Sequence, residues 1–438
     1  MNQSLVPRIG VGALSSPLEV GADRAAGASA DLAKLLESAG CEVIQLGEIG
    51  NADQALAAGE KLAVSDVDAI VLAPACWCED YLALDLLGYS DAPLLLWSLP
   101  GMETGALCGA QQLSSYLKQL EHPYCCVFGA IADGDEMAKA ISFCKAAALK
   151  RRLRRGRVGI AGHRPAGMTE VAANEFALKK AVGPRVMPLD LPQLLQRATE
   201  IEDAPARKAW EQLSSRAGKC KVDGATGLDS MKVYLTIKEL VETKRLDALT
   251  VGCYPHLMGR VCLAASLLAD EGIPLGCEGD VNGAVGQLML ALLTGQPTHN
   301  TDWLEPLEDG SVVFTHCGSG SFTLAEKTGD ITLDSVRLMG QGVCALFPAR
   351  PGPVTLVNLM PCGDGYQLTV LEGQALSTEM VFPGNPLRVQ FDKPTPQLID
   401  WIHDEGVGHH WMAGYGHVGR ELKLWAMLTG PALRFVKP

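Results

Sequence analysis

The chain lacks the features that mark several large classes of protein. It has no excess of positive charge: in its 438 residues Asp and Glu number 50 against 37 Lys and Arg, which gives a net charge of −13. This acidic balance argues against nucleic acid, or an anionic membrane surface, as the main partner. No apolar run reaches the length that a membrane-spanning helix needs, so we expect no membrane partner either.

Targeting signals, paired-cysteine motifs and nucleotide-binding motifs are missing as well. The segment Met1 to Arg8 does not have the basic-then-apolar layout of a secretory signal peptide. The 14 cysteines lie in apolar segments of a large chain, which favours buried, reduced thiols, and Cys76-x-Cys78 does not have zinc-ribbon spacing. No glycine pattern of the dinucleotide-binding or P-loop type occurs. We therefore expect a cytoplasmic protein without a nucleotide cofactor.

What the chain does contain is an alternation of strand and helix patterns up to about residue 309. Short apolar runs such as Arg8 to Leu14 are typical of buried strands, and Ala25 to Ala39 has the pattern of an amphipathic helix. Buried strands that alternate with helices predict parallel sheets covered on both faces. We expect two flavodoxin-like α/β domains, over residues 1–152 and 153–309.

The pattern of the sequence changes after Gly310. Short apolar runs, among them Ser321 to Ala325 and Val354 to Leu359, follow one another without helical segments and are separated by proline and glycine. This pattern is typical of an antiparallel barrel or sandwich. We expect a mostly antiparallel β-barrel domain over residues 310–438, closed by a terminal helix from Gly419 to Leu428.

The most informative stretch surrounds Glu278. A short apolar run, Ile273 to Leu275, leads to the acidic pair Glu278 and Asp280, and an almost wholly apolar segment follows from Val281 to Leu293. A helix that is apolar all round must be buried, and Asp280 stands where its N-cap belongs. Glu278 is then placed at the carboxyl end of a strand, where open α/β sheets bind ligands. A carboxylate there is costly unless it is neutralised, as a metal ion would do.

Further candidate ligands follow downstream. Asp302 lies in Thr-Asp-Trp, His316 in Thr-His-Cys-Gly, and His409 and His410 in Gly-His-His-Trp. Two carboxylates with one or two imidazoles form a mixed oxygen and nitrogen site, which suits Mn²⁺, Co²⁺, Fe²⁺ or Zn²⁺. The alternative for each residue taken alone is an ordinary capping carboxylate or a core or surface histidine.

These motifs, in this order, resemble those of the L-fucose/L-arabinose isomerase superfamily. The resemblance rests on Gly-Cys-Glu-Gly-Asp-Val-Asn-Gly-Ala before an apolar helix, and then on Asp-Trp, Thr-His-Cys-Gly and Gly-His-His. It is closest over residues 250–319, whereas the first domain agrees mainly in layout. It implies a metal-dependent aldose–ketose isomerase that works as a trimer or hexamer. We expect Mn²⁺ as the cofactor, with Co²⁺ or Mg²⁺ as alternatives.

The resemblance also implies roles for particular residues. Glu278 and Asp302 become the metal-binding carboxylates that act as acid and base. His410 becomes a metal ligand, with His409 as the alternative ligand or a substrate contact. His316 matches a further metal ligand of the arabinose branch, which the fucose branch does without, so its role stays open.

The expected reaction moves a proton between C1 and C2 of a sugar through an enediol. Two carboxylates can carry the proton, while a divalent ion holds neighbouring sugar oxygens. The candidate substrates are a pentose, a 6-deoxyhexose, or a hexose modified at C6, including a sulfonated one, whose anionic tail Arg164 could meet. A metal-dependent lyase or epimerase on a sugar acid, and a non-catalytic sugar-binding relative, remain alternatives.

The first domain carries no catalytic motif of its own. Its strand ends present Trp77, Trp97 and Met102, apolar groups that are suited to flank a sugar or a partner chain. We therefore expect a homo-oligomer in which the first domain of one subunit covers the site of another.

Overall fold

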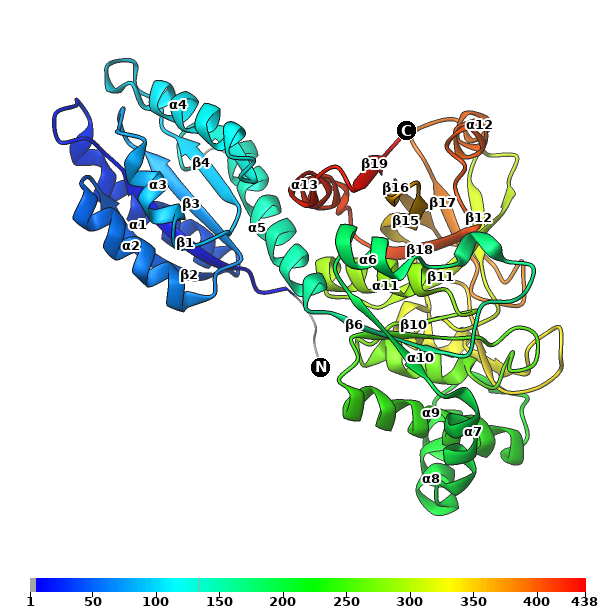
Figure 1. Ribbon diagram of the computed structural model, residues 1–438. Coiled ribbons are helices and arrows are strands. Elements are labelled where there is room, and N and C mark those ends of the chain that lie inside the picture. The colour runs from blue at the N-terminus through cyan, green and yellow to red at the C-terminus, as the bar shows by residue number, and fades with distance from the viewer. Residues whose placement is uncertain (1–4, 133) are drawn as a thin grey trace. The chain divides into compact units, whose positions relative to one another are not determined.

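The computed structural model describes residues 5–132 and 134–438, which form two compact units (Figure 1). The small unit comprises Leu5–Arg152 and Arg420–Leu428, and the large unit comprises Leu153–Gly419 and Thr429–Pro438. The predicted division into three domains, with boundaries at residues 152 and 309, stays a prediction. Of the segment on which the expected lack of a signal peptide depends, residues 1–4 lie outside the described residues.

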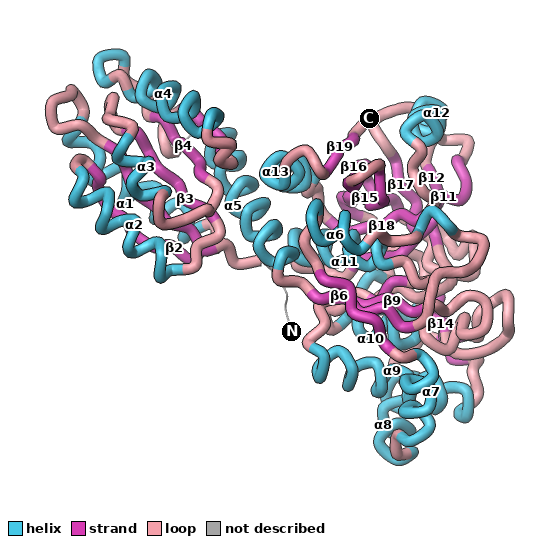
Figure 2. Tube along the Cα trace, in the orientation of Figure 1, coloured by secondary structure: helices cyan, strands magenta, loops and turns pink. Residues whose placement is uncertain are grey.

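The small unit is built on a five-stranded parallel sheet in the order β2-β1-β3-β4-β5, the order that flavodoxin has. Its central strands are almost wholly apolar and buried, because helices cover the sheet (Figure 2). The strands are β1 (Arg8–Leu14), β2 (Glu42–Ile49), β3 (Ala69–Pro74), β4 (Leu94–Ser98) and β5 (Tyr124–Phe128). The helices are η1 (Ala22–Arg24), α1 (Ala25–Ser38), α2 (Ala52–Ser65), α3 (Tyr81–Leu87), η2 (Met102–Thr104), α4 (Ala106–Gln119), α5 (Gly134–Arg154) and α13 (Gly419–Thr429).

The large unit begins with a four-stranded parallel sheet in the order β10-β9-β6-β7. Its strands are β6 (Arg157–Ala161), β7 (Arg185–Leu189), β9 (Ala248–Val251) and β10 (Leu275–Gly276). Its helices are η3 (Thr169–Val171), α6 (Glu175–Ala181), α7 (Leu191–Glu200), α8 (Asp203–Ser214), α9 (Gly224–Lys244), α10 (Cys262–Asp270) and α11 (Val281–Thr294).

Helix α11 is the apolar segment that follows Glu278, and it is buried along almost its whole length. As predicted, Asp280 caps its first turn, where Oδ1 accepts a hydrogen bond from the amide of Gly283 at 2.8 Å. Gly295 ends the helix in the left-handed conformation, at φ 66°. The helix contacts both β9 of the parallel sheet and β18 of the sheet that follows, so it forms the middle layer of this unit.

A seven-stranded, mostly antiparallel sheet completes the large unit, in the order β15-β18-β11-β12-β17-β16-β19, and β15 also pairs with β16. The barrel form of this sheet stays a prediction. Its strands are β11 (Thr298–Pro306), β12 (Val312–Thr315), β15 (Gly352–Cys362), β16 (Gly365–Leu376), β17 (Leu387–Gln390), β18 (His410–Tyr415) and β19 (Leu433–Val436). A small sheet joins β8 (Lys219–Cys220), β13 (Thr332–Asp334) and β14 (Cys344–Leu346).

The expectation of strands without helices after residue 310 is wrong at two places. The predicted strand from Ser321 to Ala325 is instead the short 3₁₀ helix η4 (Phe322–Leu324), whose first turn the Ser321 hydroxyl caps. A second 3₁₀ turn, η5 (Thr328–Asp330), follows it. Helix α12 (Thr395–Glu405) was missed, although a proline in its first turn and Gly406 just after its end are ordinary boundary signals. Among the described helices, none combines the length and apolarity that crossing a membrane requires.

Candidate active site

Three adjacent strands of the antiparallel sheet bring candidate ligands together. Asp302 lies within β11, where it pairs with His410 of β18 on one side and with Thr315 of β12 on the other. His316 is the next residue after Thr315. Directly opposed residues of an antiparallel pair have Cβ atoms about 4.5–5.5 Å apart, so this register places Asp302 beside His410. His316 joins them, with Nε2 3.9 Å from Asp302 Oδ2. No strand was expected at Asp302 or at His410, so β11 and β18 were missed.

Glu278 reaches the same place from the parallel sheet. It follows β10, and its backbone adopts the left-handed conformation at φ 61°. That conformation costs a residue with a side chain about 1–3 kcal/mol and persists where the surrounding structure holds it. Two hydrogen bonds hold the turn: the Glu278 amide donates to Cys253 Sγ at 3.4 Å, and the next amide, of Gly279, donates to the Val251 carbonyl at 3.0 Å.

His410 connects Glu278 with the start of helix α11. Its ring is buried, with Nε2 3.0 Å from Glu278 Oε2 and Nδ1 2.8 Å from Asp280 Oδ2. Burial acts to lower the pKa of His410, but the hydrogen bonds with Asp280 and Glu278 outweigh it and raise the pKa well above its ordinary value. Asp280 therefore has two tasks, since one oxygen caps the helix while the other fixes the ring of His410.

His316 lies between the two carboxylates and a group of thiols. Its Nε2 atom is 3.9 Å from Glu278 Oε2 and 3.9 Å from Asp302 Oδ2. Burial acts to lower the pKa of His316, yet Cys277, Asp302 and Glu278 together raise it to about 9. Its ring centroid is 5.8 Å from that of His410, so both imidazoles belong to one cluster.

The side chains of Glu278, Asp302, His316 and His410 fit a divalent metal ion. Donor atoms of Glu278, His316 and His410 all lie within 4.8 Å of one another, and so do donor atoms of Asp302, His409 and His410. The 3.0 Å between His410 Nε2 and Glu278 Oε2 matches neighbouring ligands that are each about 2.1 Å from an octahedral ion. Asp302 Oδ1 is buried and has no hydrogen-bond partner among the described residues, which is costly unless it binds a cation. Oxygen and nitrogen donors of this kind suit Mn²⁺, Co²⁺ or Mg²⁺.

His409 differs from its neighbour. Its side chain is 41% exposed, and Nδ1 lies 2.7 Å from Glu170 Oε1. Its ring centroid is 4.2 Å from that of His410. The buried ring of His410, held by two carboxylates, is therefore the better candidate ligand, and the role of His409 as a substrate contact stays a prediction.

The other two predicted contacts lie outside this cluster. The backbone of Arg164 packs against Gly279, where an added Cβ would approach the Arg164 amide to 2.7 Å, but its guanidinium donates to the Pro165 carbonyl at 3.1 Å. Trp97 is fully buried in the small unit, where Nε1 donates to the Gly129 carbonyl at 3.0 Å. A ring enclosed in this way presents no surface to a sugar, which contradicts the prediction that Trp97 flanks the substrate.

A cavity of about 170 Å³ opens onto the candidate ligands. Glu278, Asp302 and His316 line it together with Arg337 and Phe382. The guanidinium of Arg337 lies 5.0 Å from the centroid of the Phe382 ring, and no other Lys or Arg is among the described residues that line the cavity. Sequence reasoning missed Arg337, because it is a single arginine in an irregular segment that carries no motif.

The double task of Asp280 leads to a prediction. Asp280→Asn should keep the helix cap, because asparagine caps about as well as aspartate, but it removes the negative charge that fixes His410. Loss of such a supporting carboxylate typically costs about 10–100-fold in metal affinity or activity. We expect a loss of that size in Mn²⁺ affinity, measured by titration calorimetry, while circular dichroism still shows the folded protein.

The matched control is Asp190→Asn at the N-cap of α7, where the side chain accepts a hydrogen bond from the Gln193 amide at 2.8 Å. This variant should bind Mn²⁺ as the wild type does. Unchanged Mn²⁺ affinity in Asp280→Asn would show that the carboxylate serves the helix alone.

The chain is similar in sequence to several known enzymes over most of its length. The chain is 25% identical over 377 residues to a sulfoquinovose isomerase of Priestia aryabhattai, which covers 81% of this chain and 82% of that protein. It is 23% identical over 343 residues to a sulfoquinovose isomerase of Alkalicoccus urumqiensis, with 76% and 77% covered. A sulfoquinovose isomerase of Clostridium sp. (strain MSTE9) is 26% identical over 351 residues, with 76% and 78% covered. No protein-family model matches the chain.

Proposed function

We propose that this protein is an aldose–ketose isomerase that acts on a sulfonated aldohexose and depends on a divalent metal ion, Mn²⁺ in first place and Co²⁺ or Mg²⁺ as alternatives. The observation that carries the proposal is the meeting of Glu278 and Asp302, from two different sheets, beside His316 in one cavity. The similarity to sulfoquinovose isomerases over most of both chains supports the same reaction class. The wider relation to the L-fucose/L-arabinose isomerase superfamily is part of this proposal.

The chemistry requires a proton to leave the carbon beside the carbonyl and to return to the neighbouring carbon. Glu278 and Asp302 line the cavity and can serve as base and acid in this transfer. When bound, the divalent ion polarises the sugar carbonyl and stabilises the negative charge that develops on its oxygen. Asp280 keeps His410 in place, and His316 and His410 complete the set of ligands.

The sulfonate end of the substrate is assigned to Arg337. A guanidinium presents several donors in a fixed plane, which matches an anionic group with several oxygens. In the same cavity the carboxylates lie beside His316, while Arg337 lies over Phe382. This arrangement gives a sugar with one anionic end a defined orientation. Arg164 remains a second candidate, although its guanidinium is engaged by the Pro165 carbonyl.

A homo-oligomer is also part of the proposal. Three residues that line the cavity expose large apolar side chains: Tyr254 at 42%, Leu304 at 41% and Leu338 at 58%. Exposed apolar groups that gather at one place are typical of an interface with another chain. A second copy of this chain that covers the cavity would shield them from water.

The test is a substrate panel with the full-length protein and Mn²⁺. Sulfoquinovose, glucose, L-fucose and L-arabinose are incubated in D₂O, and the products are identified by NMR. We expect a ketose from sulfoquinovose, with deuterium incorporated at the exchanging carbon, and much less conversion of the uncharged sugars. A cleaved product would indicate a lyase, an inverted C2 an epimerase, and binding without conversion a non-catalytic protein; each outcome contradicts the proposal.

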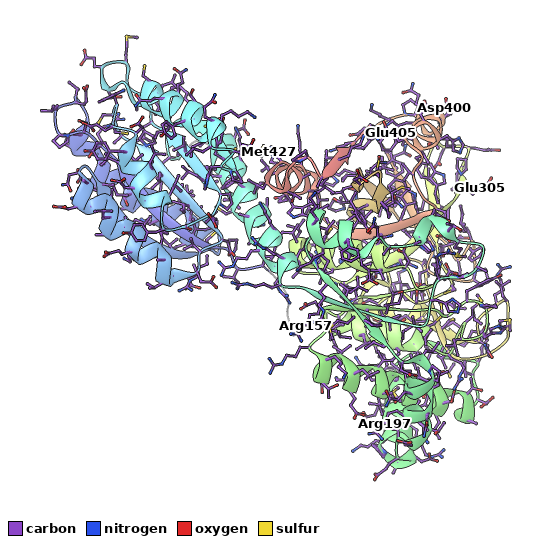
Figure 3. The ribbon with its side chains drawn as sticks, viewed as in Figure 1. Arg157, Arg197, Glu305, Asp400, Glu405 and Met427 are labelled. Carbon is purple, nitrogen blue, oxygen red and sulfur yellow. The ribbon has the colours of Figure 1, made fainter. Side chains whose placement is uncertain are left out.

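In the same assay Arg337→Met should reduce kcat/KM for sulfoquinovose, mainly through a higher KM. A hydrogen bond to a charged group contributes about 1.5–3 kcal/mol, and because Arg337 is exposed we expect the lower end of this range, roughly a tenfold loss. The matched control is Arg197→Met, which replaces an exposed arginine on α7 (Figure 3) that does not line the cavity. This variant should have wild-type kcat/KM. Equal losses on charged and uncharged sugars would remove Arg337 from sulfonate recognition.

A further inference from the structure

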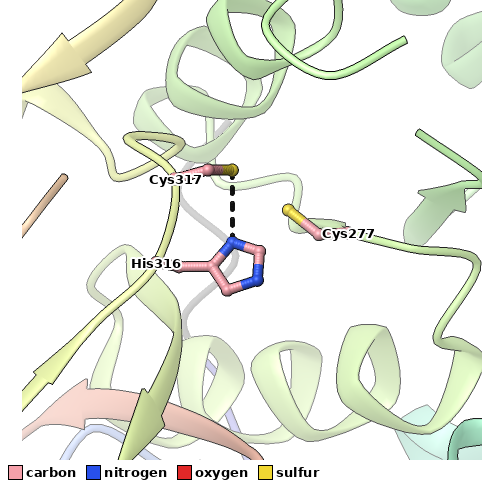
Figure 4. Close-up of side chains that lie close together, drawn as sticks. All are labelled: Cys277, His316 and Cys317. Carbon is pink, nitrogen blue, oxygen red and sulfur yellow. Dashed lines mark hydrogen bonds between the residues drawn. The ribbon is translucent and has the colours of Figure 1, made fainter. Parts of the chain in front are cut away.

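A group of thiols meets the Nδ1 edge of His316. Cys317 Sγ lies 3.2 Å from His316 Nδ1 and 3.6 Å from Cys262 Sγ, and Cys277 Sγ lies 3.6 Å from the hydroxyl of Ser319. Figure 4 shows the sulfurs of Cys277 and Cys317 on neighbouring sides of the imidazole. All of these cysteines are free thiols.

Donor atoms of Cys277, His316 and Cys317 all lie within 4.8 Å of one another. Around a tetrahedral zinc ion, ligands at about 2.0–2.3 Å lie about 3.3–3.8 Å apart. The 3.2 Å between Cys317 Sγ and His316 Nδ1 is close to that range. Two sulfurs and one nitrogen could therefore close on an ion after small side-chain movements.

We propose that Cys277, Cys317 and Nδ1 of His316 form a second metal site, which takes a thiophilic divalent ion, Zn²⁺ in first place. Thiolate ligands select zinc and other soft ions, whereas carboxylates and imidazoles suit Mn²⁺ or Mg²⁺. The two thiol protons and the Nδ1 proton of His316 pass to solvent as the ion binds. Cys317 also lines the cavity, which gives the ion an entry route and leaves the fourth position of a tetrahedral site to water.

The two sites share one imidazole through different atoms. Nε2 of His316 faces Glu278 and Asp302, each at 3.9 Å, whereas Nδ1 faces Cys317. With one ion on each nitrogen, the ring of His316 would bridge them as an imidazolate, and both ions would hold its orientation. The two ions would thus bind together and would not compete. The proposal concerns binding and does not require the isomerase activity.

The test uses the full-length protein, reduced and loaded with Mn²⁺, to which Cd²⁺ is added as a spectroscopic substitute for Zn²⁺. We expect one equivalent of Cd²⁺ to produce a sulfur-to-metal charge-transfer band in the ultraviolet, while electron paramagnetic resonance shows that Mn²⁺ stays bound. Cys277→Ala and Cys317→Ala should each weaken Cd²⁺ binding by more than about tenfold, because removing a ligand costs more than removing a supporting group.

Two matched controls remove buried thiols that do not belong to the proposed site of Cys277, His316 and Cys317. Cys262→Ala removes the sulfur in contact with Cys317, and Cys78→Ala removes one from the small unit; both should keep the band. Because a variant in the core can fail to fold, X-ray absorption of the zinc-loaded wild type gives an independent measurement. Two sulfur neighbours at about 2.3 Å are expected. A shell of oxygen and nitrogen alone, absence of the band in the wild type, or an unchanged band in Cys277→Ala and Cys317→Ala would each overturn the proposal.

Discussion

Glu278→Gln and Asp302→Asn are each expected to fold and to lose most of their turnover. Both substitutions keep the size of the side chain but remove a base and weaken a metal ligand. General acid–base groups contribute about 10²–10⁴-fold to rate, and the lost ligation adds to this. The measurement is ketose formation from sulfoquinovose at saturating Mn²⁺, with circular dichroism to verify the fold.

The matched control is Glu305→Gln, because Glu305 is an exposed carboxylate on the same strand as Asp302 (Figure 3). This variant should retain wild-type turnover. If either site variant stays within a few-fold of the wild type, that carboxylate does not belong to the catalytic pair.

Removal of the metal is the second change with a large expected effect. Protein stripped with a chelator should lose activity and melt at a lower temperature, and Mn²⁺ should restore both. An ion at 100 times its Kd stabilises the folded state by about 2.7 kcal/mol. The outcome that contradicts a metal-dependent site is full turnover by protein verified as metal-free.

The same site gives metal binding a defined pH dependence. Metal binding requires neutral imidazoles, but the surrounding Cys277, Asp302 and Glu278 raise the pKa of His316 to about 9 despite its burial. Because the pKa of His410 is raised as well, binding must release protons from both imidazoles at neutral pH, and Mn²⁺ affinity should rise with pH at least up to about 9. In metal-free protein the sign is opposite: protonated His316 stabilises the fold fully below about pH 6.5, and this stabilisation is lost as the pH rises through about 9.

The part of the site that local sequence signals describe was predictable. Asp280 as a cap, the apolar helix α11 after it and Gly295 at its end follow from residues within one helix. That Asp302 and His410 lie side by side could not be predicted from local sequence signals. Their pairing depends on the register of β11 and β18, strands separated by more than 100 residues. Only the resemblance to a known family predicted that these two residues belong to one site.

The errors have physical reasons as well. Trp97 lies within the buried strand β4, and an aromatic ring there gains more from packing in its own core, with a hydrogen bond for Nε1, than from an exposed position. Arg337 and the sulfur atoms of Cys277 and Cys317 gave no signal, because each acts through neighbours distant in sequence. Helix α12 was missed because it lies in a segment otherwise rich in strands, where proline and glycine also mark the turns between strands.

The left-handed backbone of Glu278 bears on how such a sequence can diverge. Glycine adopts φ 61° without the steric penalty that a side chain brings, and asparagine tolerates it better than glutamate does. Relief of backbone strain would therefore favour glycine or asparagine at this position, whereas the bond between the carboxylate and His410 and the proposed catalytic role favour glutamate. A homologue that carries glycine or asparagine here while it keeps the rest of the fold should have relieved the backbone strain and given up the reaction. This one position can thus separate active from inactive descendants in a set of related sequences.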